Sequence, residues 1–154
     1  MSVSLYCGLG DLPLFNPDIE ASDPVPVANF RDLILSADAL IIASPEYAHG
    51  VTGAMKNALD WMVGCEAFVH KPVALLNASP RAIHAQAALR ETVSVMSAHI
   101  VEQACITLAL LGAKLSEDDI VQHPQISAAL LDALIALQKV VNAQGNANTA
   151  SRAF

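Results

Sequence analysis

The sequence predicts an α/β domain, in which helices cover a mainly parallel sheet with four recognisable strands. Residues 39–43 and 72–77 form apolar runs without alternation of polar and apolar positions, as expected of strands buried on both faces. Each run is followed by a stretch with helical periodicity, and strands that alternate with helices are typical of parallel sheets.

The other predicted elements follow from local patterns. Residues 3–6 alternate and are compatible with a short strand, and residues 104–108 predict the last strand. Four helices are predicted from apolar residues at helical spacing: 27–37, 53–63, 82–98 and 124–142. Residues 110–121 are predicted to form a loop. The domain is expected to span residues 1–142, and the small, polar residues 143–154 to form a flexible tail.

Composition restricts the function. A chain of 154 residues fits one domain, and 54% hydrophobic with only 15% charged residues suggests that another subunit covers part of its surface. The net charge of −7, without a cluster of Lys or Arg, argues against nucleic acid and against anionic membranes. The apolar runs are too short to cross a bilayer, and no export signal is visible. We therefore expect a soluble, cytoplasmic protein.

Cysteine and histidine patterns do not predict a metal site. Cys7, Cys65 and Cys105 lie far apart and form no Cys-x-x-Cys pair, so we expect reduced, structural thiols. The five histidines have no metal-ligand spacing among themselves or with cysteine. No catalytic side chain and no metal are therefore predicted.

The candidate site consists of the two loops that follow the buried strands. Both strands end in Ala-Ser-Pro, at Ala43 and at Ala78. Loops at the carboxyl ends of neighbouring parallel strands lie side by side and are where open α/β sheets bind ligands. The candidate binding residues are Ser44, Pro45, Glu46, Tyr47, Ala48 and His49 in the first loop, and Ser79, Pro80 and Arg81 in the second.

The first loop carries a family resemblance. Ser44-Pro45-Glu46-Tyr47, followed by a short linker and Lys56-Asn57-Ala58-Leu59-Asp60-Trp61, resembles the signature of the NADPH-dependent FMN reductase family, which includes quinone and azo-dye reductases. Residues 44–61 match closely, and the similarity extends more loosely over residues 3–140. The resemblance implies a flavodoxin-like three-layer sandwich that transfers hydride from NADPH (or NADH) through bound FMN to a small-molecule electron acceptor. It also implies a homodimer or homotetramer built through helix 53–63.

The resemblance assigns roles within the loops. Residues 45–48 are expected to contact the flavin ring, largely through their backbone, because flavin chemistry needs ring stacking and hydrogen bonds more than acids or bases. Glu46 either contacts ligand or braces its own loop or a partner subunit. His49, where the family often has Asn or Ser, either binds substrate or phosphate or faces solvent. The family's second loop is usually rich in glycine, whereas residues 80–86 of this chain contain none. Arg81 is therefore expected to fill space that backbone would otherwise line.

One departure leaves two hypotheses open. Residues 3–6 and Asp11–Asp18 resemble the second strand of the family and the segment after it, so the family's first strand, serine-rich phosphate-binding loop and first helix have no counterpart. Either Met1 is not the natural start, or half of the usual flavin site is lost. The first hypothesis is a flavin-dependent reductase. The second is a degenerate flavodoxin-like domain without flavin that serves as a non-catalytic interaction protein.

Overall fold

A parallel sheet forms the centre of the molecule, which is a computed structural model that describes the backbone of residues 1–151 and the side chains of residues 1–146. Its strands are β1 (Leu40–Ala43), β4 (Pro72–Asn77), β5 (His99–Ile100) and β6 (Ile106–Thr107). The order is β1-β4-β5, and β6 also pairs with β4, every pairing being parallel. The predicted α/β class with a parallel sheet is confirmed.

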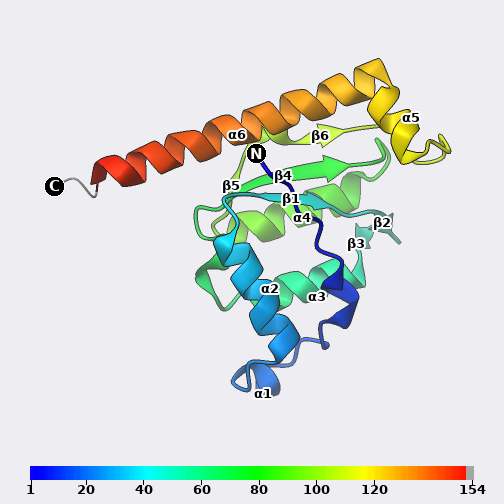
Figure 1. Ribbon diagram of the computed structural model, residues 1–154. Helices are drawn as coiled ribbons and strands as arrows, with labels where there is room; N and C mark the ends of the chain where they lie inside the picture. The colour runs from blue at the N-terminus through cyan, green and yellow to red at the C-terminus, as the bar shows by residue number, and fades with distance from the viewer. Residues whose placement is uncertain (152–154) are drawn as a thin grey trace.

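Helices cover both faces of this sheet (Figure 1). On one face, α2 (Val25–Ser36), α3 (Gly53–Met62) and α4 (Ile83–Val95) pack around Val73 and Leu75 of β4 in the larger core. On the other face, α6 (Pro124–Ser151) packs through Leu137 against Ala74. Successive residues of β4 therefore point into different cores, which is why the strand is apolar throughout.

Short elements complete the chain. They are the 3-10 turns η1 (Gly8–Asp11), η2 (Glu66–Phe68) and η3 (Glu102–Ala104), the helices α1 (Pro17–Glu20) and α5 (Glu117–Gln122), and a hairpin of β2 (Glu46–Tyr47) and β3 (Gly50–Val51). Helix α5 lies where a loop was predicted, because Ser116 and Asp119 form a capping box that starts it.

The predicted strands at both ends of the sheet need correction. Residues 3–6 form no strand, since nothing in the described residues pairs with their backbone in a sheet. The predicted strand 104–108 is reduced to β6, and the unpredicted β5 precedes it. Between the pairs Val73↔Ile100 and Leu76↔Ile106, β4 advances three residues while the opposing chain advances six. The additional residues of the opposing chain form the turn η3, which interrupts the edge strand between β5 and β6.

The last helix is longer than predicted. It continues past residue 142 as far as Ser151, so most of the predicted flexible tail is helical, while residues 152–154 lie outside the described residues. Over Pro124–Asn146 it is long and apolar enough to cross a membrane, which the sequence analysis did not expect of any segment. A single helix of this kind is weak evidence for a membrane span; 11% of its apolar window is buried in the structure, and Ala133 and Leu137 are among the buried residues.

Candidate functional site

Three loops meet at the carboxyl edge of the sheet. Because Ala43 of β1 is in register with Leu76 of β4, the loops that follow these strands leave the sheet next to each other, as predicted. The segment after β6 joins them: the N–H of Leu108 donates to the carbonyl of Asn77 at 2.8 Å, and the N–H of Leu110 to that of Ala78 at 3.1 Å. The sequence analysis did not include this third loop.

Ser44 and Thr52 close the base of the first loop. Their hydroxyl oxygens are 3.4 Å apart, and the Thr52 hydroxyl also accepts the N–H of Met55 at 3.3 Å, which caps α3. This Thr was missed as a site residue, although a hydroxyl before a helical run is a recognisable capping signal. Ser44 therefore orders the loop through its side chain, and Pro45 beside it is exposed.

Glu46 joins the first loop to the helix that follows the second. Its Oε2 accepts the N–H of Ala85 in the first turn of α4 at 2.8 Å, and its Oε1 lies 3.2 Å from Nδ1 of His49. The residue at the N-cap of α4 is Ala82, which has no side-chain acceptor, so a carboxylate from a distant loop satisfies this helix end. The hydrogen bond from the Ala85 N–H is the largest cause that holds the pKa of Glu46 below its ordinary value, and the smaller contribution of the His49 hydrogen bond acts in the same direction. The structure thus places Glu46 as a brace between the loops.

The tip of the first loop is a strained two-residue turn. Ala48 and His49 connect β2 to β3 with φ of 49° and 60°, a conformation that a tight hairpin demands and that Asn-Gly adopts more easily. The turn leaves the Tyr47 side chain largely exposed, at 70%. The ring of His49 meets that of His84 edge-on with centroids 4.7 Å apart, so a second histidine, missed in the sequence, joins the site.

The second loop is organised by two buried polar side chains. Oδ1 of Asn77 accepts the N–H of Ser79 at 3.0 Å, and the Ser79 hydroxyl accepts the N–H of Arg81 at 3.3 Å. Asn77 and Ser79 are both buried, whereas Pro80 and Arg81 are exposed. Asn77 was read only as a strand end, although Asn before a turn commonly bonds the backbone two residues on.

The Lys-Asn-Ala-Leu-Asp-Trp stretch holds the N-terminal part of the chain. Nδ2 of Asn57 and Nε1 of Trp61 both donate to the carbonyl of Pro13, at 3.0 and 2.7 Å, and Oδ1 of Asn57 accepts the N–H of Phe15 at 2.8 Å. Trp61 is buried and Lys56 pairs with Asp60 along the helix, both as predicted. This half of the motif therefore has a structural role in the described chain.

The described residues fit one part of FMN better than the other. At the ring end, three loops converge, an aromatic side chain is exposed and the carboxylate of Glu46 ties the loops together. At the phosphate end, residues 1–151 contain no turn rich in glycine or serine between a strand and a helix. At the ring end the described residues thus form an edge of three linked loops, and in residues 1–151 no such turn is present to cradle a phosphate.

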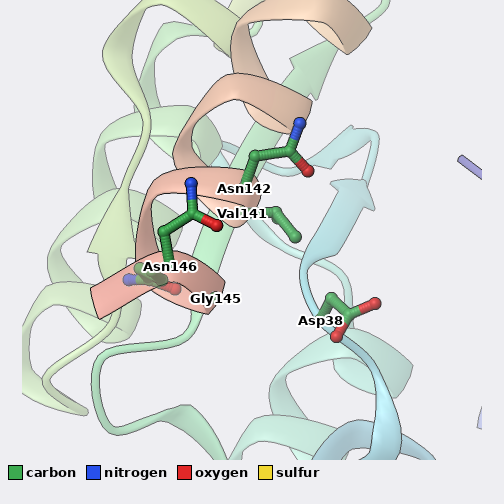
Figure 2. Close-up of a pocket in the computed structure, with 6 residues that line it drawn as sticks. Asp38, Val141, Asn142, Gly145 and Asn146 are labelled. Carbon is green, nitrogen blue, oxygen red and sulfur yellow. The ribbon is translucent and has the colours of Figure 1, made fainter. Parts of the chain in front are cut away.

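Two hollows lie elsewhere in the described part of the chain, and none of the nine predicted residues lines either of them. One, of about 510 Å³, lies between Asp38 and the last turns of α6, with Asn142 and Asn146 on its rim (Figure 2). The other, of about 150 Å³, is apolar and lies between the sheet and α6. Neither of these two hollows therefore belongs to the edge formed by the three loops.

Known proteins resemble this chain over part of their length. It is 38% identical over 105 residues to an NAD(P)H-dependent FMN reductase of Pseudomonas aeruginosa, covering 64% of this chain and 56% of that protein. It is 44% identical over 79 residues to a quinone reductase of Pseudomonas putida, covering 49% of this chain and 42% of that protein. The chain thus spans about half the length of the curated relatives that it matches.

A solved structure shares the fold. The flavoenzyme NAD(P)H:acceptor oxidoreductase FerB of Paracoccus denitrificans superposes with a TM-score of 0.63 and 24% identity, over 84% of this chain and 75% of that one. The flavodoxin-like class is therefore confirmed. The family profile described as NADPH-dependent FMN reductase matches residues 1–110, which include both candidate loops. Because this match covers most of the chain, and because its signature residues build the loop edge and the support beneath it, the protein belongs to the NADPH-dependent FMN reductase family.

Proposed function

We propose that the protein acts as an NAD(P)H-dependent FMN/quinone-type reductase, with the flavin ring at the loops after β1 and β4. The observation that carries this proposal is the bond from the Ala85 N–H to Glu46, because it ties the loop of the family signature to the first turn of α4, which directly follows the second loop. FMN would accept hydride from NADPH or NADH and pass it to a small-molecule acceptor such as a quinone or an azo dye, the substrates named for relatives.

The chain's own residues would bind and orient the ring. Residues 45–48 and 79–81 would border it, largely through their backbone, and the exposed Tyr47 side chain would cover one side. His49 and Arg81, both exposed, would face the substrate or the phosphate. No side chain needs to transfer a proton for the hydride steps, so the protein's contribution is to position the ring.

Flavin titration and turnover test the proposal together. Purified protein is titrated with FMN while flavin fluorescence is followed, and NADPH consumption is then measured with FMN and a benzoquinone present. Saturable binding and quinone-dependent NADPH oxidation above that of free FMN are expected. Glu46→Ala is expected to weaken both, whereas Glu91→Gln, at an exposed position of α4, serves as the charge-matched control. Protein that ignores FMN would refute the reductase.

A second candidate function has an observation in its favour. The missing phosphate cradle in residues 1–151 is what a domain that keeps the fold without flavin would show. Such a domain would be a non-catalytic interaction protein. The same titration separates the two functions, since the interaction protein folds normally but neither binds FMN nor oxidises NADPH.

Assembly and location remain predictions within this proposal. A homodimer or homotetramer through α3 would use exposed residues of that helix and its C-cap, such as Lys56 and Val63, because Trp61 and Met62 lie inside the core of the same chain. The cytoplasmic location is supported by three free cysteines, as found in reducing compartments. Light scattering of Val63→Glu and cell fractionation test these two predictions; a monomeric wild type or a membrane-bound protein would contradict them.

A further inference from the structure

The outward face of α6 carries apolar side chains that nothing covers in the described chain. Leu131 is 57% exposed and Ile135 is 40% exposed, while Ala133 and Leu137, on the opposite face, are buried against the sheet and its loops. The C-terminal end of α6 also projects beyond the sheet (Figure 1). Helix α6 is therefore packed along one side only.

The whole molecule exposes more surface than its mass predicts. Its accessible area is 9760 Å², whereas a folded monomer of 16.2 kDa exposes about 7,500 Å². A stable dimer needs only about 800 Å² from each partner. An interface along α6 would therefore need to cover only a small part of the exposed surface.

The charges of α6 indicate what would cover it. Between residues 124 and 151 the sequence has one acidic residue, Asp132, and one basic residue, Lys139. They are seven residues apart, so both lie on the same side of the helix beside the exposed apolar stripe. Both are exposed, and neither makes an ion pair with another described residue.

We propose that α6 packs antiparallel against α6 of a second copy about a two-fold axis. In that arrangement Asp132 faces the partner's Lys139, and the symmetry repeats the pair on the other side of the axis. The midpoint between the two charges falls at residues 135–136, close to the middle of the helix, so the two helices overlap along nearly their full length. Ile135 then lies at the centre of the contact between the two ion pairs, and Leu131 lies next to one of them.

This interface is independent of flavin binding. It lies on the face of the sheet opposite α3 and α4, and it uses none of the residues of the three loops. Failure of the reductase proposal would therefore leave it untouched, and its own failure would not affect the loops. It is also distinct from an assembly through α3.

Charge reversal gives a specific test by sedimentation equilibrium of the full chain at micromolar concentration. The wild type is expected to dimerise. Asp132→Lys and Lys139→Asp should each weaken the dimer by about tenfold or more, because each change turns two attractions into two repulsions. The double variant Asp132→Lys/Lys139→Asp should restore dimerisation, and a mixture of the two single variants should form the heterodimer selectively. Glu91→Lys serves as the control that leaves association unchanged.

Several results would overturn the proposal. A monomeric wild type, a dimer unaffected by either reversal, or a double variant that stays monomeric would each do so. Circular dichroism of each variant separates loss of association from loss of folding. Flotation with phosphatidylcholine vesicles tests the membrane alternative, and a protein that is monomeric in water but floats with vesicles would assign the apolar face to lipid instead.

Discussion

Replacing Asn57 by alanine should loosen the N-terminal part of the chain from α3. The amide of Asn57 makes two hydrogen bonds, from the Phe15 N–H at 2.8 Å and to the Pro13 carbonyl at 3.0 Å. Each such bond contributes about 1 kcal/mol, and water replaces part of that contribution because Phe15 is 37% exposed. We expect Asn57→Ala to lower the free energy of unfolding by about 1–2 kcal/mol.

A double-mutant cycle sharpens this prediction, because Trp61 donates to the same Pro13 carbonyl at 2.7 Å. Either single variant leaves the carbonyl one partner, whereas Asn57→Ala/Trp61→Phe leaves it none, so the double variant should lose about 0.5–1 kcal/mol more than the sum of the singles. Urea denaturation followed by circular dichroism measures all three variants, and Asn142→Ala on the exposed face of α6 is the control. Unchanged stability of Asn57→Ala, or strict additivity, would refute the shared-acceptor geometry.

Three further predictions concern the core and the loops. Leu75→Ala, at a fully buried position of β4, should destabilise the protein by about 2–5 kcal/mol in urea denaturation, and a loss below about 1 kcal/mol would contradict the packing described. Ala48→Asn with His49→Gly should raise the free energy of unfolding by about 1 kcal/mol, because that pair favours the positive φ of the turn; a lower stability would show that the turn is not of this type. Because the folded state lowers the pKa of Glu46, its contribution should be complete above the ordinary value of 4.5 and should disappear as the pH falls through the lowered value. The stability difference between wild type and Glu46→Gln, measured across acid pH, should therefore shrink on acidification, and a difference that grows would exclude the brace.

Elements with a strong local pattern were predictable. Helix α3 begins at Gly53 as expected, because Thr52 caps it and its apolar residues repeat at helical spacing. The apolar runs of β1 and β4 and the turn that follows each one were also predictable, since proline after serine ends a strand through local sterics. The neighbouring placement of the two candidate loops followed from these positions, whereas the binding roles of their residues stay predictions.

Features that depend on distant partners were not predictable in the same way. Residues 3–6 have the alternation of a strand and form none, because a strand exists only where another backbone pairs with it. The hairpin at residues 46–51 was missed because Ala48-His49 lacks the Asn-Gly signal of such turns. Sequence reasoning left Glu46 between ligand contact and brace, and its partner, Ala85, is 39 residues away.

The sequence by itself determined the buried strands β1 and β4 and the helices α2, α3, α4 and α6, and that two Ser-Pro loops leave neighbouring strands. These properties follow from residue size, polarity and backbone restriction, which act over a few residues. Only the tertiary structure decided that a carboxylate from the first loop caps α4, that Asn57 and Trp61 share one carbonyl, and that α6 has a face left uncovered. Such features depend on which surfaces the folded chain brings within hydrogen-bonding or van der Waals distance.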